Sequence, residues 1–351
     1  MDKINKIDLS QYQVRTDLAL ESHQMAVEQY GQQIPGVLLD EEDIEGVHIT
    51  RLSIESDEGA KLINKRPGHY ITFEASGLKR HDSNFQDQMT EIFAKDFRQY
   101  LDDIEITNDA KVLVIGLGNW NVTPDALGPM VVEKILVTSH LFELTPDEVD
   151  QGFRSVSAIA PGVLGITGIE TSDIVKGIVE KSKPDLVIAI DALASRSLNR
   201  VNSTIQIADT GINPGSGIGN KRKSLDRETL GVPVIAIGIP TVVDAVSITS
   251  DTIDYLMQHL GKQLDIRNPF GRRPSKNPDN HAKFLGIVGT LSEQEKRQLI
   301  FEVLAPIGFN LMVTPKEVDT FVEDMAGILS NGLNMALHSA VNEENVASYT
   351  N

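Results

Sequence analysis

Three short, almost uninterrupted apolar runs constrain the fold of this chain most strongly. They are Lys111–Gly116, Asp185–Ile190 and Val232–Gly238. Runs of strand length without polar alternation are typical of strands that are buried on both faces of a sheet. Segments with the apolar spacing of amphipathic helices follow these runs, at 127–136, 171–181 and 244–260. This alternation predicts an α/β fold in which a mostly parallel sheet has helices on both faces.

The rest of the chain divides by pattern into further portions. The segments Gly46–Ile54 and His69–Glu74 alternate with a period of two and predict short strands, and Asn84–Leu101 has the spacing of an amphipathic helix. Capping-box patterns predict helices whose N-cap residues are Ser292 and Thr314. We therefore expect an N-terminal mixed α/β portion with a small β content, a catalytic α/β core, an exposed loop and a C-terminal helical portion packed on the core, at residues 18–105, 106–262, 263–283 and 284–351.

Composition excludes several classes of function. The 351 residues include no cysteine, which rules out disulfides, thiolate metal sites and a cysteine nucleophile. The formal net charge of −18 would repel nucleic-acid phosphates, so no direct nucleic-acid binding is expected. No apolar run has the length of a membrane span, and the first residues lack the apolar segment of a secretory signal. We expect a cytoplasmic protein without a membrane partner.

The glycine-rich segments do not match cofactor-binding motifs. Gly116 and Gly118 follow a predicted strand, but Asn121 stands where a dinucleotide fold requires a third glycine, and no acidic residue follows at the expected distance. The segment Gly211–Lys223 lacks the Gly-Lys-Ser/Thr order of a phosphate loop. Gly-x-Ser-x-Gly and His-Glu-x-x-His are absent as well. We therefore expect no cofactor and no resident metal.

Two aspartates remain as candidates for catalysis. Asp125 lies in the loop after the first apolar run, and Asp191 directly follows the second run. Both positions are at the carboxyl ends of predicted parallel strands, where open α/β proteins bind ligands. Two neighbouring carboxyl groups cannot both ionise cheaply, so one can draw a proton from water while the other donates one. The alternative is that both aspartates only cap helices, because each precedes Ala-Leu and a predicted helix.

Several unusual strings resemble one known family. The segments 116–129, 161–174, 184–196, 209–223, 233–252 and 310–319 are similar to the spore germination proteases of endospore-forming bacteria. The resemblance implies a fold like that of hydrogenase maturation proteases and an endopeptidase that degrades small acid-soluble spore proteins during germination. It further implies an aspartic-type catalytic pair at Asp125 and Asp191, a homotetramer, and a self-processing zymogen in the forespore and spore core.

The resemblance also suggests where the zymogen is cut. Val14–Glu21 looks like a substrate site of the family, with the scissile bond between Asp17 and Leu18 and a propeptide of residues 1–17. The alternative is that Thr16 or Asp17 caps a helix that begins near Leu18.

Two other functions stay open from the sequence. A metal-dependent peptidase of the hydrogenase-maturation type could use Asp125, Asp191 and His140 as ligands, since hard oxygen donors and one imidazole make a plausible site. A non-catalytic acidic protein that binds basic or DNA-associated partners is the third interpretation.

Overall fold

The computed structural model describes residues 16–214, 223–266, 293–304 and 311–349. The helices are α1 Ala19–Tyr30, α2 Asp57–Ile63, α3 Ser83–Asp103, α4 Leu127–Lys134, α5 Ser139–Leu144, α6 Leu164–Thr167, α7 Thr171–Ser182, α8 Arg227–Leu230, α9 Ala245–Ile266, α11 Glu293–Leu304 and α12 Val318–Leu337, and a short 3₁₀ turn, η3, covers Thr123–Asp125. The strands are β1 Val37–Ile44, β2 Val47–Ile54, β3 Gly68–Glu74, β4 Val112–Gly116, β5 Val156–Ile159, β6 Leu186–Ser195, β7 Thr204–Ala208, β8 Val234–Asp244 and β9 Met312–Val313.

The contacts divide the chain into two compact units. The larger unit holds Thr16–Ser195, Asn199–Val242 and the chain from Thr314 onward. The expected N-terminal portion therefore lies in the same unit as most of the expected α/β core, whose residues 196–198 and 243–262 belong to the smaller unit. The smaller unit holds Arg196–Leu198 and the described parts of Val243–Val313. Within the smaller unit, Lys296 Nζ lies 2.6 Å from Asp254 Oδ1 and links α11 to α9.

The strands form one mixed sheet in the order β1-β2-β3-β7-β8-β6-β4-β5, with β9 paired to the end of β8. Strand β4 pairs in parallel with β5 and β6. The pairs β1–β2, β2–β3, β3–β7 and β7–β8 are antiparallel. The α/β class is thus confirmed, but β1, β2, β3, β7 and β8 pair antiparallel where a mostly parallel sheet was expected. The N-terminal strands extend the same sheet, because β3 pairs with β7, a strand that the apolar pattern did not reveal.

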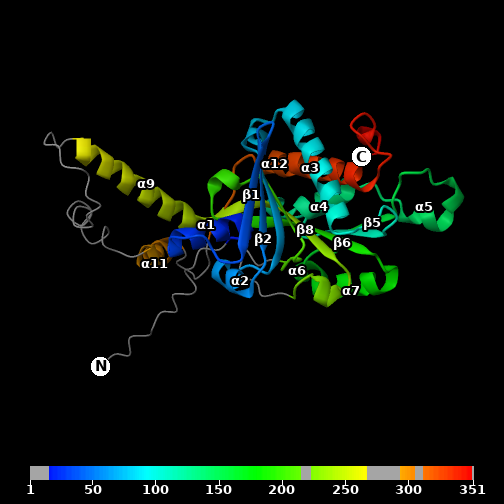
Figure 1. The fold of residues 1–351 in the computed structure, drawn as a ribbon, viewed down its shortest axis with the longest axis horizontal. Helices are drawn as coiled ribbons and strands as arrows, with labels where there is room; N and C mark the ends of the chain where they lie inside the picture. Colours follow the sequence, from blue (N-terminus) through cyan, green and yellow to red (C-terminus); the bar gives the residue numbers. More distant parts are fainter. Residues whose placement is uncertain (1–15, 215–222, 267–292, 305–310, 350–351) are drawn as a thin grey trace, which may run out of the picture. The chain divides into compact units, whose positions relative to one another are not determined.

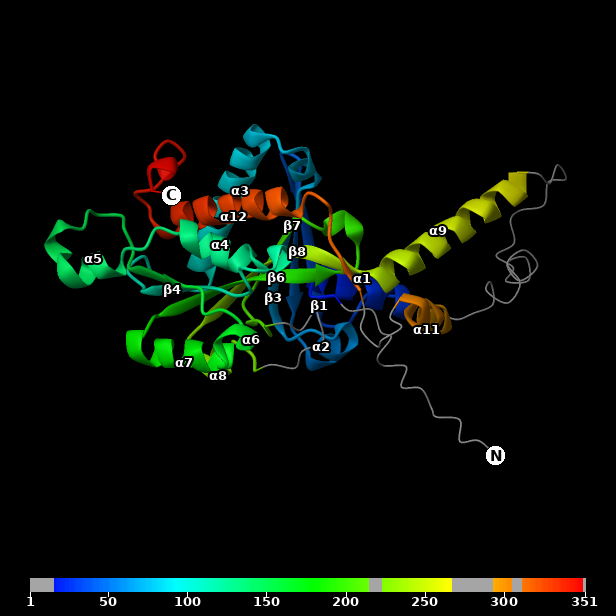
Figure 2. The same ribbon diagram turned by 180° about the vertical axis from the view of Figure 1, so that it is seen from behind.

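Helices cover both faces of the sheet, as expected. Figure 1 shows α3, α4 and α12 above the strands and α2, α6 and α7 below them, and the reverse view in Figure 2 agrees and adds α8 to the lower layer. The strand residues divide between the two layers by alternation: Val112 and Val114 join the core under α3, α4 and α12, whereas Leu113 and Ile115 pack with α7 and α8.

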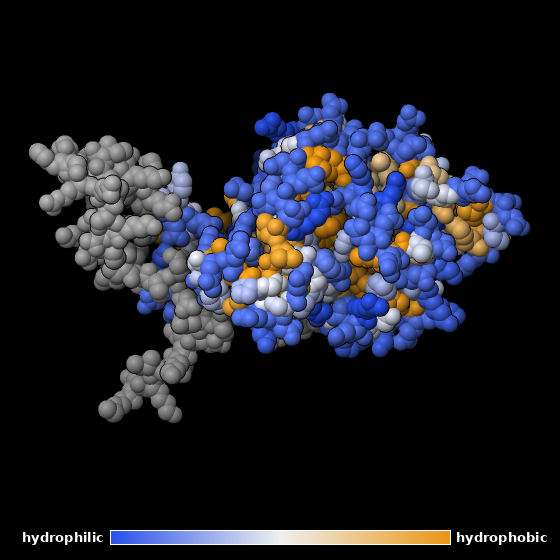
Figure 3. All heavy atoms as spheres, viewed as in Figure 1, coloured by the Kyte–Doolittle hydropathy of each residue, from blue (hydrophilic) through white to orange (hydrophobic). Residues whose placement is uncertain are grey.

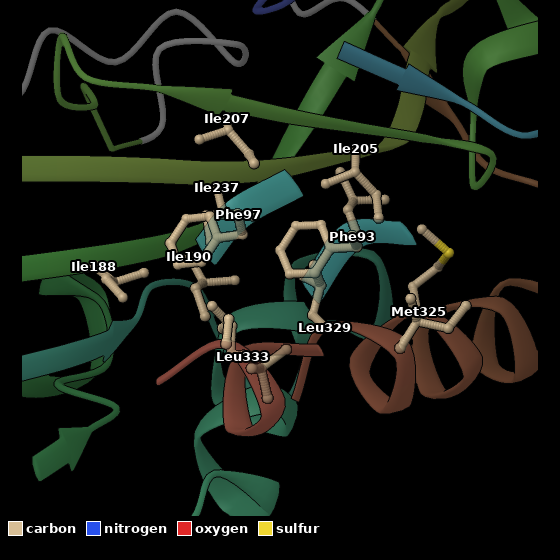
Figure 4. Close-up of a cluster of buried hydrophobic side chains, with 14 of the residues drawn as sticks. Phe93, Phe97, Ile188, Ile190, Ile205, Ile207, Ile237, Met325, Leu329 and Leu333 are labelled. Atoms are coloured by element: carbon tan, nitrogen blue, oxygen red, sulfur yellow. The ribbon is translucent and has the colours of Figure 1, made fainter. Parts of the chain in front are cut away.

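The main core lies between the sheet and helices α3 and α12. Phe93 and Phe97 of α3 are fully buried and stack with ring centroids 5.6 Å apart. In Figure 4 they lie between isoleucines of β6, β7 and β8 and the side chains of Met325, Leu329 and Leu333 of α12. Burying each aromatic side chain contributes roughly 1.5–3 kcal/mol to stability, so this cluster holds the sheet and its upper helices together.

The helices that were expected at 84–101, 127–136, 171–181 and 244–260 correspond to α3, α4, α7 and α9. The capping box at Thr314 is wrong, because α12 begins at Val318 and the Thr314 hydroxyl donates to the carbonyl of Thr241 instead, at 2.9 Å. Helix α11 begins at Glu293, while Ser292 lies outside the described residues. The predicted loop at 263–283 also lies outside them, apart from its first four residues, which belong to α9.

None of the helices in the described ranges combines the length and apolar character needed to cross a membrane.

Candidate active site

The loop that carries Asp125 folds back onto the end of β4. The Asp125 amide donates to the carbonyl of Val122 at 2.7 Å, and the Asp125 carbonyl accepts from the Asn119 amide at 2.9 Å. The hydroxyl of Thr241, on β8, donates to the carbonyl of Pro124 at 2.6 Å. These hydrogen bonds on both sides fix the position of the Asp125 backbone in the loop that follows β4.

Gly118 makes this loop possible. Its φ is +115°, in a region that favours glycine, and a Cβ there would lie 2.0 Å from the Asp125 carbonyl oxygen and 3.3 Å from Asp125 Oδ1. The carboxyl group of Asp125 thus lies over Gly118, where a larger residue would displace it.

A second pair of glycines brings α4 against the strands. A Cβ at Gly116 would lie 2.2 Å from the Gly128 carbonyl oxygen, and a Cβ at Gly128 would lie 2.3 Å from the Leu117 carbonyl oxygen. Gly128 therefore provides the close helix–strand approach for which a dinucleotide fold uses its third glycine. The glycines of this region position α4 and the Asp125 loop.

Asp191 lies inside β6, which continues to Ser195, and not after the end of the strand as expected. Its side chain is 7 % exposed, and Oδ1 accepts from the next amide, that of Ala192, at 2.9 Å. The helix-cap alternative is wrong for both aspartates. No helix follows Asp191 directly, because β6 continues beyond it. The N-cap residue of α4 is Ala126 and not Asp125.

The backbone brings the two aspartates to the same edge of the sheet. Gly116 pairs with Ile190, the residue before Asp191, and the Leu117 amide donates to the Ile190 carbonyl at 2.7 Å. Ile188 and Ile190 face the core under α3, α4 and α12. By strand alternation, the side chain of Asp191 projects from the opposite face.

The predicted cleavage bond is fastened to the same strand. The Asp17 amide donates to the Ala194 carbonyl at 2.9 Å, and the Ala194 amide donates to Asp17 Oδ2 at 2.9 Å. Asp17 therefore does not cap α1. The N-cap of that helix is Leu18, whose side chain is completely buried.

Two side chains hold the carbonyl group of the Asp17–Leu18 peptide. Lys65 Nζ donates to the Asp17 oxygen at 2.8 Å and to the Thr16 oxygen at 3.1 Å. Gln206 Nε2 donates to the Asp17 oxygen at 3.3 Å, and Gln206 Oε1 accepts from the Ala19 amide at 2.6 Å. Gln206 lies on β7 between Ile205 and Ile207, which face the core under α3, so it projects from the same face of the sheet as Asp191.

A buried carboxylate lies just beyond the bond. Glu21 is 2 % exposed, and its Oε1 lies 3.3 Å from Arg200 Nη1, while its Oε2 accepts from the Thr16 hydroxyl. The same hydroxyl accepts from the Leu18 amide at 3.1 Å. Desolvation lowers the pKa of Lys65, and the nearby carboxylates of Asp17 and Glu21 partly oppose that shift.

His140 lies at the opposite end of the parallel strands. It lies two residues after Thr138, whose amide donates to the carbonyl of Val156 at 2.9 Å, and Val156 pairs with Val112, the first residue of β4. The structure therefore does not bring His140 to the aspartates, and the described residues contain no group of three His, Asp or Glu side chains that could hold a metal ion.

Sequence reasoning missed the residues that surround the cleavage bond. Lys65 follows α2, Gln206 lies on the unpredicted strand β7, and Glu21 lies in the first turn of α1. Only Glu21 carried a signal, because it stands three residues after the residue that caps α1, where a capping-box carboxylate is found. The other two come from positions about 50 and 190 residues away along the chain.

The sequence is similar to germination proteases over almost its full length. The family model described as germination protease matches residues 15–350. A germination protease of Bacillus cereus (strain G9842) is 55 % identical over 363 residues, covering 98 % of this chain and 99 % of the relative. A germination protease of Bacillus anthracis (strain CDC 684 / NRRL 3495) is 55 % identical over 364 residues with the same coverage.

A solved structure of a NiFe hydrogenase maturation protease, HycI from Thermococcus kodakarensis KOD1, is 23 % identical, with a TM-score of 0.25. The match covers 37 % of this chain and 74 % of that one.

Proposed function

The chain belongs to the germination protease family and is a peptidase, and we propose that it is an aspartic-type endopeptidase whose catalytic pair is Asp125 and Asp191. The observation that carries this proposal is the meeting of three features on β6. Asp191 lies within the strand. The Leu117 amide, at the start of the Asp125 loop, donates to the carbonyl of Ile190, the residue before Asp191. Asp17, on one side of the predicted cleavage bond, is hydrogen-bonded to Ala194, three residues after Asp191.

The proposed reaction is hydrolysis by water without a covalent intermediate. One aspartate is ionised and removes a proton from water as the water attacks the peptide carbonyl carbon. The other is protonated, polarises the carbonyl oxygen and then supplies a proton to the leaving amine nitrogen. One water molecule is consumed, and a carboxylate and an amine are produced.

The proposed substrates are the small acid-soluble proteins of spores, whose degradation accompanies germination. The family assignment supports a role in germination. The acidic surface, with a net charge of −18, supports a partner that is protein and not nucleic acid. We place the active enzyme in the spore core, where these substrates occur.

The chain is also proposed to process itself at Asp17–Leu18, with residues 1–17 as the propeptide. This is supported by the fixed position of the bond, whose carbonyl receives hydrogen bonds from Lys65 and Gln206. Such donors could stabilise the negative charge that develops on the carbonyl oxygen during attack.

A homotetramer is the proposed assembly. Exposed apolar side chains at Val137, Leu141 and Leu144, in and before α5, offer a surface for contact between copies, and Figure 3 shows apolar colour over this helix. The edge strand β1 is a poorer candidate because four consecutive acidic residues, Asp40–Asp43, would repel a second copy. Sedimentation equilibrium of the processed chain checks the stoichiometry.

The test of the catalytic pair is substitution by asparagine, which removes the charge and the acidic proton but keeps the shape. Asp125→Asn and Asp191→Asn should each slow cleavage of a purified small acid-soluble spore protein by about 10²–10⁴-fold. Asp185→Asn is the matched control, because Asp185 lies at the other end of β6, where it accepts from the Lys111 amide at 2.7 Å. Normal rates in both active-site variants would overturn the assignment.

A further inference from the structure

The proposed processing at Asp17–Leu18 creates a new chain end at Leu18. Hydrolysis of Asp17–Leu18 adds the oxygen and one hydrogen of water to Asp17 and the other hydrogen to Leu18. At neutral pH the products are an α-carboxylate on Asp17 and an α-ammonium on Leu18. Because Leu18 is completely buried, this ammonium group would form inside the protein.

The surroundings of Leu18 make a free ammonium costly. It would stand at the N-terminus of α1, where the helix dipole disfavours positive charge. A buried charge without a partner costs several kcal/mol. The next residue is held in place, because the Ala19 amide donates to Gln206 Oε1 at 2.6 Å.

One carboxylate is positioned to receive this charge. Glu21 is in the first turn of α1 and 2 % exposed, and the Thr16 hydroxyl lies between its Oε2 and the Leu18 nitrogen. Thr16 belongs to the segment that processing removes. When Thr16 leaves, Glu21 Oε2 loses the hydroxyl that donated to it, and the Leu18 nitrogen loses the same hydroxyl as its acceptor.

We propose that Glu21 is a built-in binding site for the α-ammonium of Leu18 in the processed chain. This inference rests on the proposed cleavage at Asp17–Leu18. The new ion pair has the arrangement of a capping box, in which the carboxylate at the third helical position reaches back to the nitrogen of the cap residue. Arg200 keeps Glu21 in place through its contact with Oε1, and Arg200 is itself held by Glu74, with Nε to Oε1 at 2.7 Å.

Lys65 is the competing cation. It loses its acceptors on Thr16 and Asp17 when the propeptide leaves, and its pKa already responds to Glu21. If Lys65 forms the ion pair with Glu21 instead, the Leu18 ammonium does not pair with that carboxylate. The two arrangements differ in the accessibility of the Leu18 amine.

The experiment measures the reactivity of the Leu18 α-amine in the full-length protein after it has processed itself. An amine-reactive acetylating reagent is applied between pH 6 and 10, and modification of Leu18 is read by peptide mass spectrometry. We expect labelling at least tenfold slower than that of a denatured sample, and a titration midpoint above the ordinary range of about 7.7–8.0 for an α-amino group. The unfolded sample is the internal reference, so the wild type alone can decide the matter.

Glu21→Gln should restore fast labelling with a midpoint at or below the ordinary range, whereas Glu28→Gln, an exposed position on the same helix, should not. Fast labelling of the wild type would overturn the inference but leave the peptidase assignment intact. A chain that never yields a product beginning at Leu18 would overturn both the inference and the self-processing on which it rests.

Discussion

Lys65 is the residue whose surroundings bear most directly on the proposed self-processing. Its ammonium group donates to two successive carbonyl groups, one of which belongs to the predicted cleavage bond. Burial lowers its pKa, which makes the group a better hydrogen-bond donor to a developing oxyanion than a fully hydrated lysine would be.

Lys65→Met should slow self-processing by about 10- to 100-fold, because it removes the closer of the two donors to the Asp17 oxygen. The measurement is the rate at which purified full-length chain loses residues 1–17, followed by mass spectrometry. Lys61→Met, on the exposed face of α2, is the control. A normal or faster rate in Lys65→Met would show that the lysine only anchors the propeptide.

At the scale of elements, the Asp125 loop and β6 position the two candidate aspartates. The position of β4 and the start of β6 followed from their apolar runs, because strands buried on both faces have a strong local signal. The extension of β6 to Ser195 could not be predicted in this way. There, Ala194 is hydrogen-bonded to Asp17, which lies 177 residues away along the chain. The sequence pattern therefore predicts that Asp191 follows the strand, whereas it lies within β6.

The same reason explains the error about the sheet. Strand β7 has only five residues, and it connects the N-terminal strands to the core through antiparallel pairs that no local pattern specifies. The edge position of Asp125 and Asp191 could still be predicted, because it depends only on β4 and the first part of β6. The residues around the cleavage bond could not, since they meet only in the folded chain.

Gly118→Ala tests the loop directly. A Cβ at this position would overlap the Asp125 carbonyl, and the backbone would be strained at φ +115°. We expect at least a 100-fold loss of peptidase activity with the fold retained by circular dichroism. Gly177→Ala on α7, where an added Cβ meets nothing within 4 Å, should leave activity unchanged. Full activity in Gly118→Ala would mean that the loop does not need to hold Asp125 in this position.

At the scale of the whole molecule, stability should depend on pH through a buried histidine. His338 is fully buried, its Nδ1 accepts from the Arg154 amide at 3.1 Å, and desolvation lowers its pKa to about 4. Between pH 6.5 and 4 the unfolded chain binds a proton that the folded chain does not. The free energy of unfolding must therefore fall as the pH falls through this window. Above and below the window, His338 contributes no further change.

The expected loss from His338 is about 3 kcal/mol across the window, most of it present by pH 5. Urea unfolding at pH 7.5 and pH 5 measures it. His338→Asn keeps an acceptor for the Arg154 amide but does not titrate, so its free energy of unfolding should change less between these two pH values. An equal change in the variant and the wild type would assign the pH dependence to other groups.

In the proposed mechanism, Asp125 and Asp191 act as one ionised and one protonated carboxyl group. The most direct measurement is kcat/KM of the processed enzyme on a small acid-soluble spore protein as a function of pH, before and after exhaustive chelation. A bell-shaped profile that chelation leaves unchanged, and that collapses in either asparagine variant, is the predicted result. Loss of activity on chelation, or an intact bell in Asp125→Asn or Asp191→Asn, would contradict it.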